Sequence, residues 1–243
     1  MRPFSTGREP RRPVFVAHRG ASDRALENSP AAFALAVSDG ADLVEFDVRL
    51  SSDGVPVVFH DGRTGRTAKE NLAVARTPAA RLRTVRLKNG EAFPFLADVL
   101  EIFRGSVPVN IESKVPGGIA AAAKALSEAR YGGEVLLSSA LRDECLAARD
   151  LLPGIPCGLV ARRPSASDLS FCLRHGLSSI HPDRRHLSVL RLRRVAASGI
   201  PHLPYTVDDP GEAFALIAAG ASGVFSNRAH FIRGEYLRQF PNG

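Results

Sequence analysis

Short apolar segments recur along the chain with helix-like segments between them, and this alternation constrains the fold more than any other feature. Strands are predicted at 14–18, 43–48, 107–112, 134–139, 156–161, 178–182, 201–207 and 223–227. Helices are predicted between them at 29–40, 95–105, 117–133, 142–152, 165–176, 188–199 and 210–220. Such alternation is typical of parallel βαβ units. Eight strands without a linker-like interruption predict an α/β fold with a single closed (β/α)₈ barrel.

A further strand-like run, "VPVVFH" at 55–60, does not fit this count. It follows the second predicted strand after only "SSDG", which is far too short for the crossover of about a dozen residues that joins parallel neighbours. The run must therefore turn back. We expect a hairpin arm at the rim of the second strand, with Asp53 and Gly54 as its turn pair.

The stretch 62–94 is polar, rich in turn residues and longer than an ordinary loop between a strand and a helix. We expect it to form a small insertion after the second strand, over the barrel mouth, because long loops inside compact domains usually carry function. Residues 1–13 are predicted to be a flexible N-terminal segment. Residues 14–243 are predicted to be one barrel domain.

The composition bounds the class of protein and its partners. A chain of 243 residues that is 44% hydrophobic and 23% charged can bury a sizeable core. The formal net charge of +7 favours anionic partners, which include nucleic acid, membrane surfaces and phosphate esters. The arginines are spread along the chain without interleaved aromatic residues, so we do not predict nucleic-acid binding. No pattern in the sequence indicates an oligomeric state.

Two further sequence patterns bear on the cellular compartment in which the protein is expected. The three cysteines are odd in number and scattered in apolar contexts, which indicates buried free thiols rather than disulfides or a metal site. No apolar run approaches the roughly 20 residues that span a bilayer, and "MRPFSTGREPRRP" lacks the apolar core of a signal peptide. We therefore expect a cytoplasmic protein without stable insertion into a membrane.

Polar side chains gather at the carboxyl ends of the first predicted strands, where barrels of this kind build their active sites. The candidates are His18 and Arg19 at the end of the first strand, Glu45 and Asp47 on the second, His60 and Asp61 on the arm, and Asn110, Glu112 and Lys114 from the third. Histidine and arginine are costly to bury without partners. Their place at a strand end therefore indicates a functional site.

Glu45 and Asp47 are two residues apart on one strand, so both point to the same side of the sheet. Like charges this close repel unless a cation lies between them. Glu112 on the next strand completes a set of three carboxylates, and hard oxygen ligands suit one divalent cation, Mg²⁺ or Ca²⁺, better than zinc. The alternative is that Glu45 and Asp47 pair with arginines at the barrel rim.

His18 and His60 suit a general acid and a general base, because displacement at phosphorus needs one proton removed and one supplied. Either histidine alone is more simply explained as a satisfied core residue. Arg19 and Lys114 suit the phosphate oxygens. The alternative for these two cations is a pair of salt bridges, to Glu27 and Glu112.

The spacing of these residues resembles the glycerophosphodiester phosphodiesterase family. The run "HRGASDRALENSPAAFALAVSDGADLVEFDVRLSSDGVPVVFHD" is similar to the opening of that family, and "FPFLADVLE", "NIESK" and "GASGVFSNRA" continue the match from residue 14 to about 233. The resemblance implies a TIM barrel of the phospholipase-C-like phosphodiesterase type. It implies cleavage of glycerophosphodiesters to sn-glycerol 3-phosphate and an alcohol with a divalent cation.

The same resemblance implies roles for particular residues. His18 and His60 correspond to the acid/base pair, Glu45, Asp47 and Glu112 to the metal ligands, and Arg19 and Lys114 to the phosphate contacts. Tyr205 stands where the family usually has a tryptophan in the substrate pocket. Ser226 and Asn227 begin a turn in which many members carry a carboxylate.

Two other activities are compatible with these motifs. A lysophospholipase D would use the same chemistry on a lysophospholipid, and we would then expect an exposed apolar lip. A non-catalytic barrel that binds anions would have lost its acid/base groups, whereas this chain keeps both histidines. The many arginines of 62–94 leave the leaving-group preference open.

Overall fold

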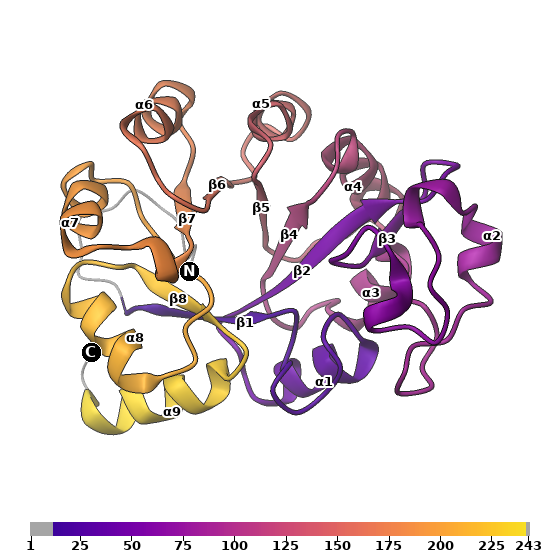
Figure 1. Cartoon of the computed structure of the whole chain (residues 1–243), viewed down its shortest axis with the longest axis horizontal. Coiled ribbons are helices and arrows are strands. Elements are labelled where there is room, and N and C mark those ends of the chain that lie inside the picture. Colours follow the sequence, from indigo (N-terminus) through magenta and orange to yellow (C-terminus); the bar gives the residue numbers. More distant parts are fainter. Residues whose placement is uncertain (1–11, 242–243) are drawn as a thin grey trace.

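A curved sheet forms the centre of the molecule, and helices lie around its outside (Figure 1). The computed structural model describes residues 12–241, so most of the predicted N-terminal segment 1–13 lies outside the described residues. Within this range the sheet has the order β7-β6-β5-β4-β2-β1-β8, with parallel pairing throughout, and β3 pairs with β2 alone. The strands are β1 (Val14–His18), β2 (Leu43–Leu50), β3 (Pro56–Val58), β4 (Val109–Ser113), β5 (Val135–Ser139), β6 (Cys157–Ala161), β7 (Ser179–Pro182) and β8 (Gly223–Ser226).

The strand predicted at 201–207 does not form a regular strand, although this segment runs between β7 and β8. Leu203 donates its backbone N–H to the carbonyl of Ile180 in β7 at 3.1 Å, and Phe225 in β8 donates to the carbonyl of Pro204 at 2.9 Å. Pro201 and Pro204 have no N–H to donate, so a continuous ladder cannot form. Isolated hydrogen bonds therefore close the barrel, and the predicted (β/α)₈ architecture is confirmed.

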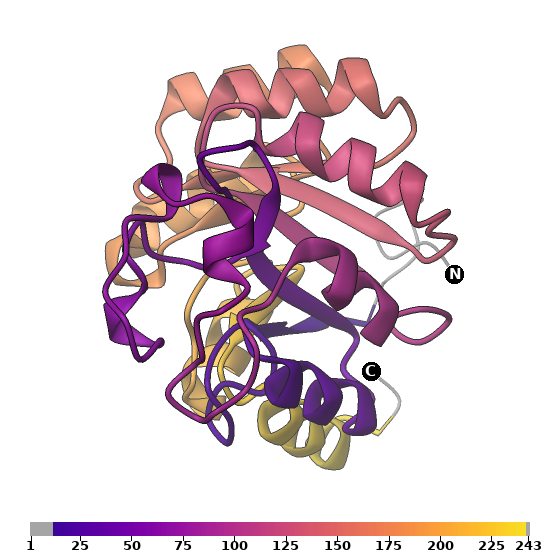
Figure 2. The same ribbon diagram turned by 90° about the vertical axis from the view of Figure 1, so that its right-hand side faces the viewer.

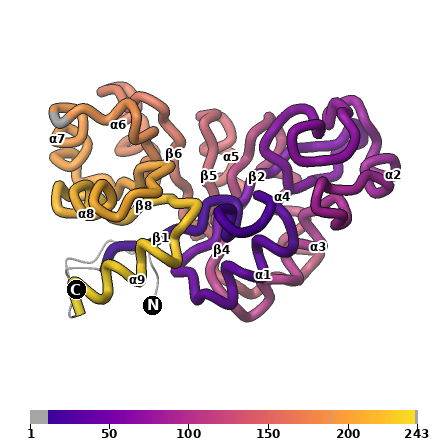
Figure 3. The backbone as a smooth tube through the Cα atoms, turned by 60° about the horizontal axis from the view of Figure 1, so that its bottom comes forward, coloured from indigo at the N-terminus to yellow at the C-terminus, as the bar shows by residue number. Residues whose placement is uncertain are grey.

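The seven predicted helices are all present. Two helices were not predicted from the periodic pattern, a single-turn helix within 62–94 and an extra helix after β8. Serine caps three of the predicted helices: Ser29 accepts from the N–H of Ala32, Ser165 from that of Asp168, and Ser188 from that of Arg191. The helices are α1 (Pro30–Ser38), α2 (Ala79–Leu82), α3 (Leu96–Ile102), α4 (Gly118–Glu128), α5 (Arg142–Leu151), α6 (Ala166–His175), α7 (Val189–Ala197), α8 (Pro210–Ala218) and α9 (Ala229–Gln239). Figure 3 shows the extra helix, α9, alongside β1.

Helix α4 is capped by a residue from the next helix. Gly117 at its N-cap has φ +80° and offers no side chain to the free N–H groups of the first turn. The buried carboxylate of Glu144 in α5 accepts instead from the backbone N–H groups of Gly117 and Ile119, each at 2.7 Å, and from the hydroxyl of Ser113 at 3.0 Å. This contact fixes α4 and α5 against the end of β4.

The apolar core has an inner part and an outer part. Val16, Leu43, Leu136, Leu203 and Phe225 pack together, with Val14 and Tyr205 against them, inside the barrel. A larger cluster lies between the strands and the surrounding helices and includes stacked Phe46 and Phe103, with ring centroids 5.8 Å apart. No helix within residues 12–241 combines the length and the apolar character that a bilayer span requires.

The predicted arm and insertion form a unit with its own small core. β3 pairs antiparallel with β2, as expected, with Val58 opposite Val48 and Pro56 opposite Leu50. The segment 62–94 adds short helical turns and α2, and its apolar side chains pack on the arm. Figure 2 shows this unit, in purple, as a separate group of short elements at the left of the view.

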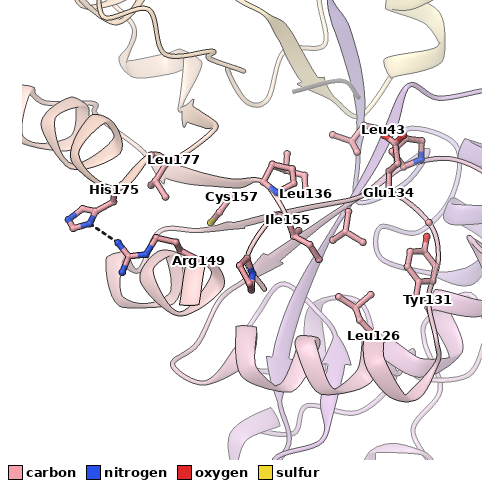
Figure 4. A pocket seen from close by; sticks show the side chains of 17 residues that line it. Leu43, Leu126, Tyr131, Glu134, Leu136, Arg149, Ile155, Cys157, His175 and Leu177 are labelled. Carbon is pink, nitrogen blue, oxygen red and sulfur yellow. Dashed lines mark hydrogen bonds between the residues drawn. The ribbon is translucent and has the colours of Figure 1, made fainter. Parts of the chain in front are cut away.

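A cavity of about 730 Å³ lies at the end of the barrel where the strands begin (Figure 4). Leu43, Leu136 and Cys157 line it near the starts of their strands, and Arg149 and His175 line it from the ends of α5 and α6. The side chains of Arg149 and His175 are hydrogen-bonded to each other at 3.2 Å. In residues 12–241 the one group of three or more potential metal ligands lies elsewhere.

Candidate active site

The candidate site is a second cavity, of about 460 Å³, at the carboxyl ends of the strands. Seven of the eight predicted site residues line it, namely His18, Arg19, Glu45, His60, Glu112, Lys114 and Tyr205. The eighth, Asp47, is fully buried and contacts two of them. The fold thus brings together side chains that are up to 187 positions apart, from His18 to Tyr205.

The three predicted metal ligands face one another. Sheet register places Glu45 beside His18 of β1, and Asp47 beside Glu112 of β4. Each carboxylate offers one oxygen, and these oxygens lie within 4.8 Å of one another. Glu45 and Asp47 are buried, and Glu112 is partly exposed to the cavity. Three carboxylates at this spacing form a potential site for one hard cation.

Asp47 is held by cations and an amide. Its carboxylate lies 2.9 Å from the Lys114 Nζ and 3.1 Å from the Arg19 Nε, and it accepts a hydrogen bond of 2.7 Å from the Asn28 side chain. Burial alone would raise the pKa of Asp47, but Lys114 and Arg19 together hold this pKa well below its ordinary value. Asp47 is therefore charged in the folded protein.

Glu45 has fewer partners. One oxygen, Oε2, accepts from the backbone N–H of Arg19 at 3.0 Å, while the other, Oε1, is buried and has no hydrogen-bond partner within residues 12–241. Burial raises the pKa of Glu45 well above its ordinary value, and the negative charges of Asp47 and Glu112 raise it further. A buried carboxylate oxygen without a donor is the arrangement that a bound cation would satisfy.

A left-handed turn after β1 places Arg19. Arg19 has φ +58°, and Gly20, which follows it, has φ +84°. Gly20 lies against the backbone of Ala32, so a Cβ on residue 20 would come within 2.7 Å of an Ala32 atom. Only glycine fits at position 20, because it has no Cβ. The Arg19 guanidinium donates to Glu27 at 2.7 Å. The positions of both the arginine and its backbone N–H thus depend on this turn.

The two salt bridges that are the alternative to phosphate binding by Arg19 and Lys114 are both formed. Arg19 pairs with Glu27, and Lys114 pairs with Glu112 as well as with Asp47. The carboxylates keep these cations at the cavity wall. A structural role in the ion pairs and a position at the cavity are therefore compatible for both residues.

The two histidines have different partners. His18 Nδ1 is 2.9 Å from the side-chain oxygen of Asn227, and its Nε2 is 4.0 Å from Glu45. Burial, followed by the charge of Arg19, lowers the pKa of His18 to about 4. His60 Nδ1 is 2.7 Å from the carboxylate of Asp61. One ring therefore contacts an amide and the other a carboxylate.

The turn after β8 supplies a carboxylate indirectly. The Asn227 side chain donates to Asp208 at 2.7 Å, and its oxygen, which faces His18, also accepts from Ser22 at 2.9 Å. Asp208 further accepts from the Ser226 hydroxyl at 2.9 Å. Asp208 therefore contacts the ring of His18 only indirectly, through the side chain of Asn227.

Arg66 from the insertion reaches the site. It donates to Asp61, the partner of His60, at 2.5 Å, and to both oxygens of Glu27, the partner of Arg19, at 2.6 and 2.7 Å. One guanidinium therefore connects the two carboxylates that hold a histidine and an arginine of the site.

Sequence reasoning gave no role to several residues of the site. His181, Arg184 and Arg185 line the cavity, while Asn28 and Asn227 contact its residues. The sequence could have indicated a role at the site for His181 and Asn227, because each stands at the carboxyl end of a predicted strand. His181 is buried, its Nε2 lies 2.9 Å from the Ser179 hydroxyl, and burial lowers the pKa of this histidine to about 3.

Tyr205, from the segment between β7 and β8, lines the same cavity. Burial raises the pKa of its phenol, and the negative charges of Glu112 and Asp183 raise it further. Its backbone N–H donates to the carbonyl of Pro182 at 2.9 Å. The tyrosine is thus neutral and fixed to the end of β7.

Comparison with known proteins identifies the family. The model of the glycerophosphoryl diester phosphodiesterase family matches residues 18–230. A glycerophosphodiester phosphodiesterase from Caldanaerobacter subterraneus subsp. tengcongensis is 29% identical over 231 residues, which are 88% of this chain and 93% of the relative. An Oleispira antarctica phosphodiesterase, solved in complex with its product sn-glycerol-3-phosphate, superposes with a TM-score of 0.85 at 28% identity, over 91% of this chain and 96% of its own.

A second solved structure, a glycerophosphodiester phosphodiesterase from Thermotoga maritima, is 26% identical with a TM-score of 0.75, and the match covers 93% of this chain and 100% of the other. The family match spans every predicted site residue, from His18 to Tyr205. The resemblance of the sequence motifs to the glycerophosphodiester phosphodiesterase family is therefore confirmed. The chain belongs to the glycerophosphoryl diester phosphodiesterase family and is an enzyme of that class, a phosphoric diester hydrolase.

Proposed function

We propose that this enzyme hydrolyses glycerophosphodiesters to sn-glycerol 3-phosphate and an alcohol, with one divalent cation at Glu45, Asp47 and Glu112 and with proton transfer by His18 and His60. The observation that carries the proposal is the group of three carboxylates, with oxygens within 4.8 Å, in a cavity that both histidines line. The product named for the Oleispira antarctica structure supports the choice of substrate.

The donor set fits Mg²⁺ or Ca²⁺. Carboxylate oxygens are the ligands that these cations prefer, and the buried Oε1 of Glu45 has no other partner among the described residues. Such an ion, when bound, would polarise a phosphate oxygen and offset its negative charge. The rest of the reaction depends on the side chains of the cavity.

Arg19 and Lys114 bind the phosphate in this proposal. Both cations border the cavity, and both are kept charged, since neighbouring carboxylates raise the pKa of Arg19 and of Lys114 despite burial. Arginine offers two parallel N–H groups to phosphate oxygens, and lysine offers a point charge. Together they stabilise the negative charge that develops in the transition state.

His18 and His60 move the protons. One accepts the proton of the attacking hydroxyl, and the other donates a proton to the oxygen of the departing alcohol. The same groups serve whether the attacking oxygen belongs to water or to the 2-hydroxyl of the glycerol part. Asn227 orients the ring of His18, and Asp61 orients that of His60.

Histidine variants test the proposal. We expect His18→Ala and His60→Ala to lower kcat on glycerophosphocholine by roughly 10²- to 10⁴-fold at saturating Mg²⁺ or Ca²⁺. His175→Ala is the matched control, because this histidine lies at the opposite end of the barrel. Full activity in either site variant would show that the acid/base assignment is wrong.

A substrate panel tests the activity itself. Initial rates are measured on glycerophosphodiesters and lysophospholipids, with and without EDTA. Release of sn-glycerol 3-phosphate from the glycerophosphodiesters, abolished by EDTA and restored by Mg²⁺ or Ca²⁺, is the expected result. Turnover of lysophospholipids alone would instead indicate a lysophospholipase D, and turnover that EDTA leaves unchanged would contradict the metal requirement.

A further inference from the structure

The cavity has a second wall that the proposed function does not use. The catalytic side comes from β1, β2, the arm and β4. The other side is lined by the ends of β6 and β7, the segments that follow β7, and β8. Its residues are Val160, His181, Arg184, Arg185, Tyr205, Thr206 and Phe225. A cavity of about 460 Å³ is large enough for both halves of a small phosphodiester, so one half must face this wall.

The second wall presents two fixed arginines. Arg185 donates to both oxygens of Asp183, at 3.0 and 2.7 Å. Arg184 donates to Glu212 at 3.1 Å and to the backbone carbonyl of Thr206 at 3.2 Å. Each guanidinium is therefore held by one carboxylate, which orders the side chain and leaves further N–H groups for a ligand, since arginine has five.

Positive charge exceeds negative charge around this wall. Arg162 also lies 3.9 Å from Asp183, so this carboxylate is shared by two arginines, and Arg162 donates to His186 at 3.1 Å. The pKa of His186 is lowered, by burial first and then by the charge of Arg163. Arg162 and Arg163 are both exposed. The wall thus carries more cations than the contacting carboxylates neutralise.

We propose that Arg184 and Arg185 select glycerophosphodiesters whose alcohol part carries its own phosphate or carboxylate, over those whose alcohol part is a cation such as choline. The inference rests on the proposed function and names its substrate class. The scissile phosphate binds to Arg19 and Lys114. A second anionic group on the same substrate then faces the excess positive charge of the opposite wall. A quaternary ammonium at this wall meets charges of its own sign, which disfavours its binding.

The test compares three substrates that differ in the charge of the alcohol part. They are glycerophosphocholine, which is cationic there, glycerophosphoglycerol, which is neutral, and glycerophosphoglycerol with a terminal phosphate. We expect kcat/KM of the wild-type enzyme to be at least about tenfold higher for the phosphorylated substrate than for glycerophosphocholine. Added salt should shrink this ratio, because the arginines are exposed and screened.

Paired variants locate the effect. In Arg184→Gln/Arg185→Gln the ratio of kcat/KM between the phosphorylated and the choline substrates should fall toward one. The matched control is Arg193→Gln/Arg194→Gln, which removes the same charge from exposed positions on α7, outside the cavity lining. The control should keep the wild-type ratio, and thermal unfolding of both variants confirms that they fold.

Each outcome separates this inference from the proposed function. Equal kcat/KM values for all three substrates in the wild type would overturn the preference and leave the phosphodiesterase activity intact. A wild-type preference that survives in Arg184→Gln/Arg185→Gln would overturn the assignment of these arginines. Hydrolysis of none of the substrates, with Mg²⁺ or Ca²⁺ present, would overturn the proposed function and the preference with it.

Discussion

Asn28 donates its side-chain amide to the carboxylate of Asp47 at 2.7 Å, and both residues are buried. The backbone of Asn28 has φ +55°, in the left-handed region that asparagine tolerates better than most residues. Because its backbone N–H also donates to the carbonyl of Arg19 at 3.0 Å, the asparagine links the turn after β1 to the proposed metal ligand on β2. It orients the carboxylate without bordering the cavity.

This contact predicts a loss of metal affinity when the amide is removed. Asn28→Gly keeps the left-handed backbone accessible and deletes the donor. We expect the affinity for Mg²⁺ or Ca²⁺, measured by titration calorimetry, to fall roughly 10- to 100-fold, as is typical of partners that orient metal ligands. Asn89→Gly, at an exposed turn, is the control. Unchanged metal affinity in Asn28→Gly would mean that the amide does not orient Asp47.

Glu45→Gln tests the ligand set directly. The substitution keeps the shape and an acceptor for the N–H of Arg19, but it removes the negative charge. We expect metal affinity to fall by more than the roughly 10- to 100-fold typical of an orienting partner, and activity to be lost. Without metal, thermal stability should stay equal or rise, because Glu45 is buried near Asp47 and Glu112. Retained stabilisation by added Mg²⁺ or Ca²⁺ would contradict Glu45 as a ligand.

Glu144→Ala should destabilise the barrel without touching the site. It deletes the acceptor that caps the first turn of α4 and removes the partner of two N–H groups, that of the exposed Gly117 and that of the buried Ile119. We expect the free energy of unfolding in urea to fall by about 2–3 kcal/mol. Glu144→Gln, which keeps an acceptor oxygen, should lose less. Glu128→Ala, exposed at the end of the same helix, serves as control, and an equal loss in both alanine variants would refute the cap.

The neutral His181 predicts a pH dependence of stability. Its folded pKa of about 3 lies below the ordinary value of 6.5, so between these values the unfolded chain binds a proton that the folded chain does not. Stability contributed by this residue is therefore complete above about pH 6.5 and is lost as the pH falls. The loss that His181 alone contributes to the free energy of unfolding between pH 7 and pH 5 is about 2 kcal/mol.

His181→Gln isolates this contribution. Urea unfolding at the two pH values should show a pH dependence that is smaller in this variant by about the same 2 kcal/mol. His175→Gln, which removes a half-buried histidine at the end of α6, is the control. Identical pH dependence in the wild type and His181→Gln would show that His181 is protonated in the folded protein as readily as in the unfolded chain.

The barrel and the central residues of the site could be predicted because they depend on local patterns. Glu45 and Asp47 are two apart on a strand, so the strand period alone places both on one side. The same alternation of strands and helices gave the order of the barrel. By contrast, the apolar residues of 201–207 predict a regular strand. The segment is irregular because its two prolines cannot donate hydrogen bonds to the neighbouring strands.

The partners of the site residues could not be predicted, because they come from distant parts of the chain. Asn227 reaches His18 across 209 positions, and Arg66 reaches Glu27 across 39. No local period links such pairs, and only the closed barrel brings them together. Arg184 and Arg185 follow the end of β7, but nothing near them in the sequence distinguishes them from the other arginines.

The double attachment of Arg66 ties the insertion to the turn after β1 and to the end of the arm. One guanidinium serves Glu27, which belongs to the turn after β1, and Asp61, which follows the arm. A segment transplanted from a relative in place of 62–94 would therefore need its own basic side chain at this place. Without such a side chain, Glu27 and Asp61 would each lose a cationic partner beside the site.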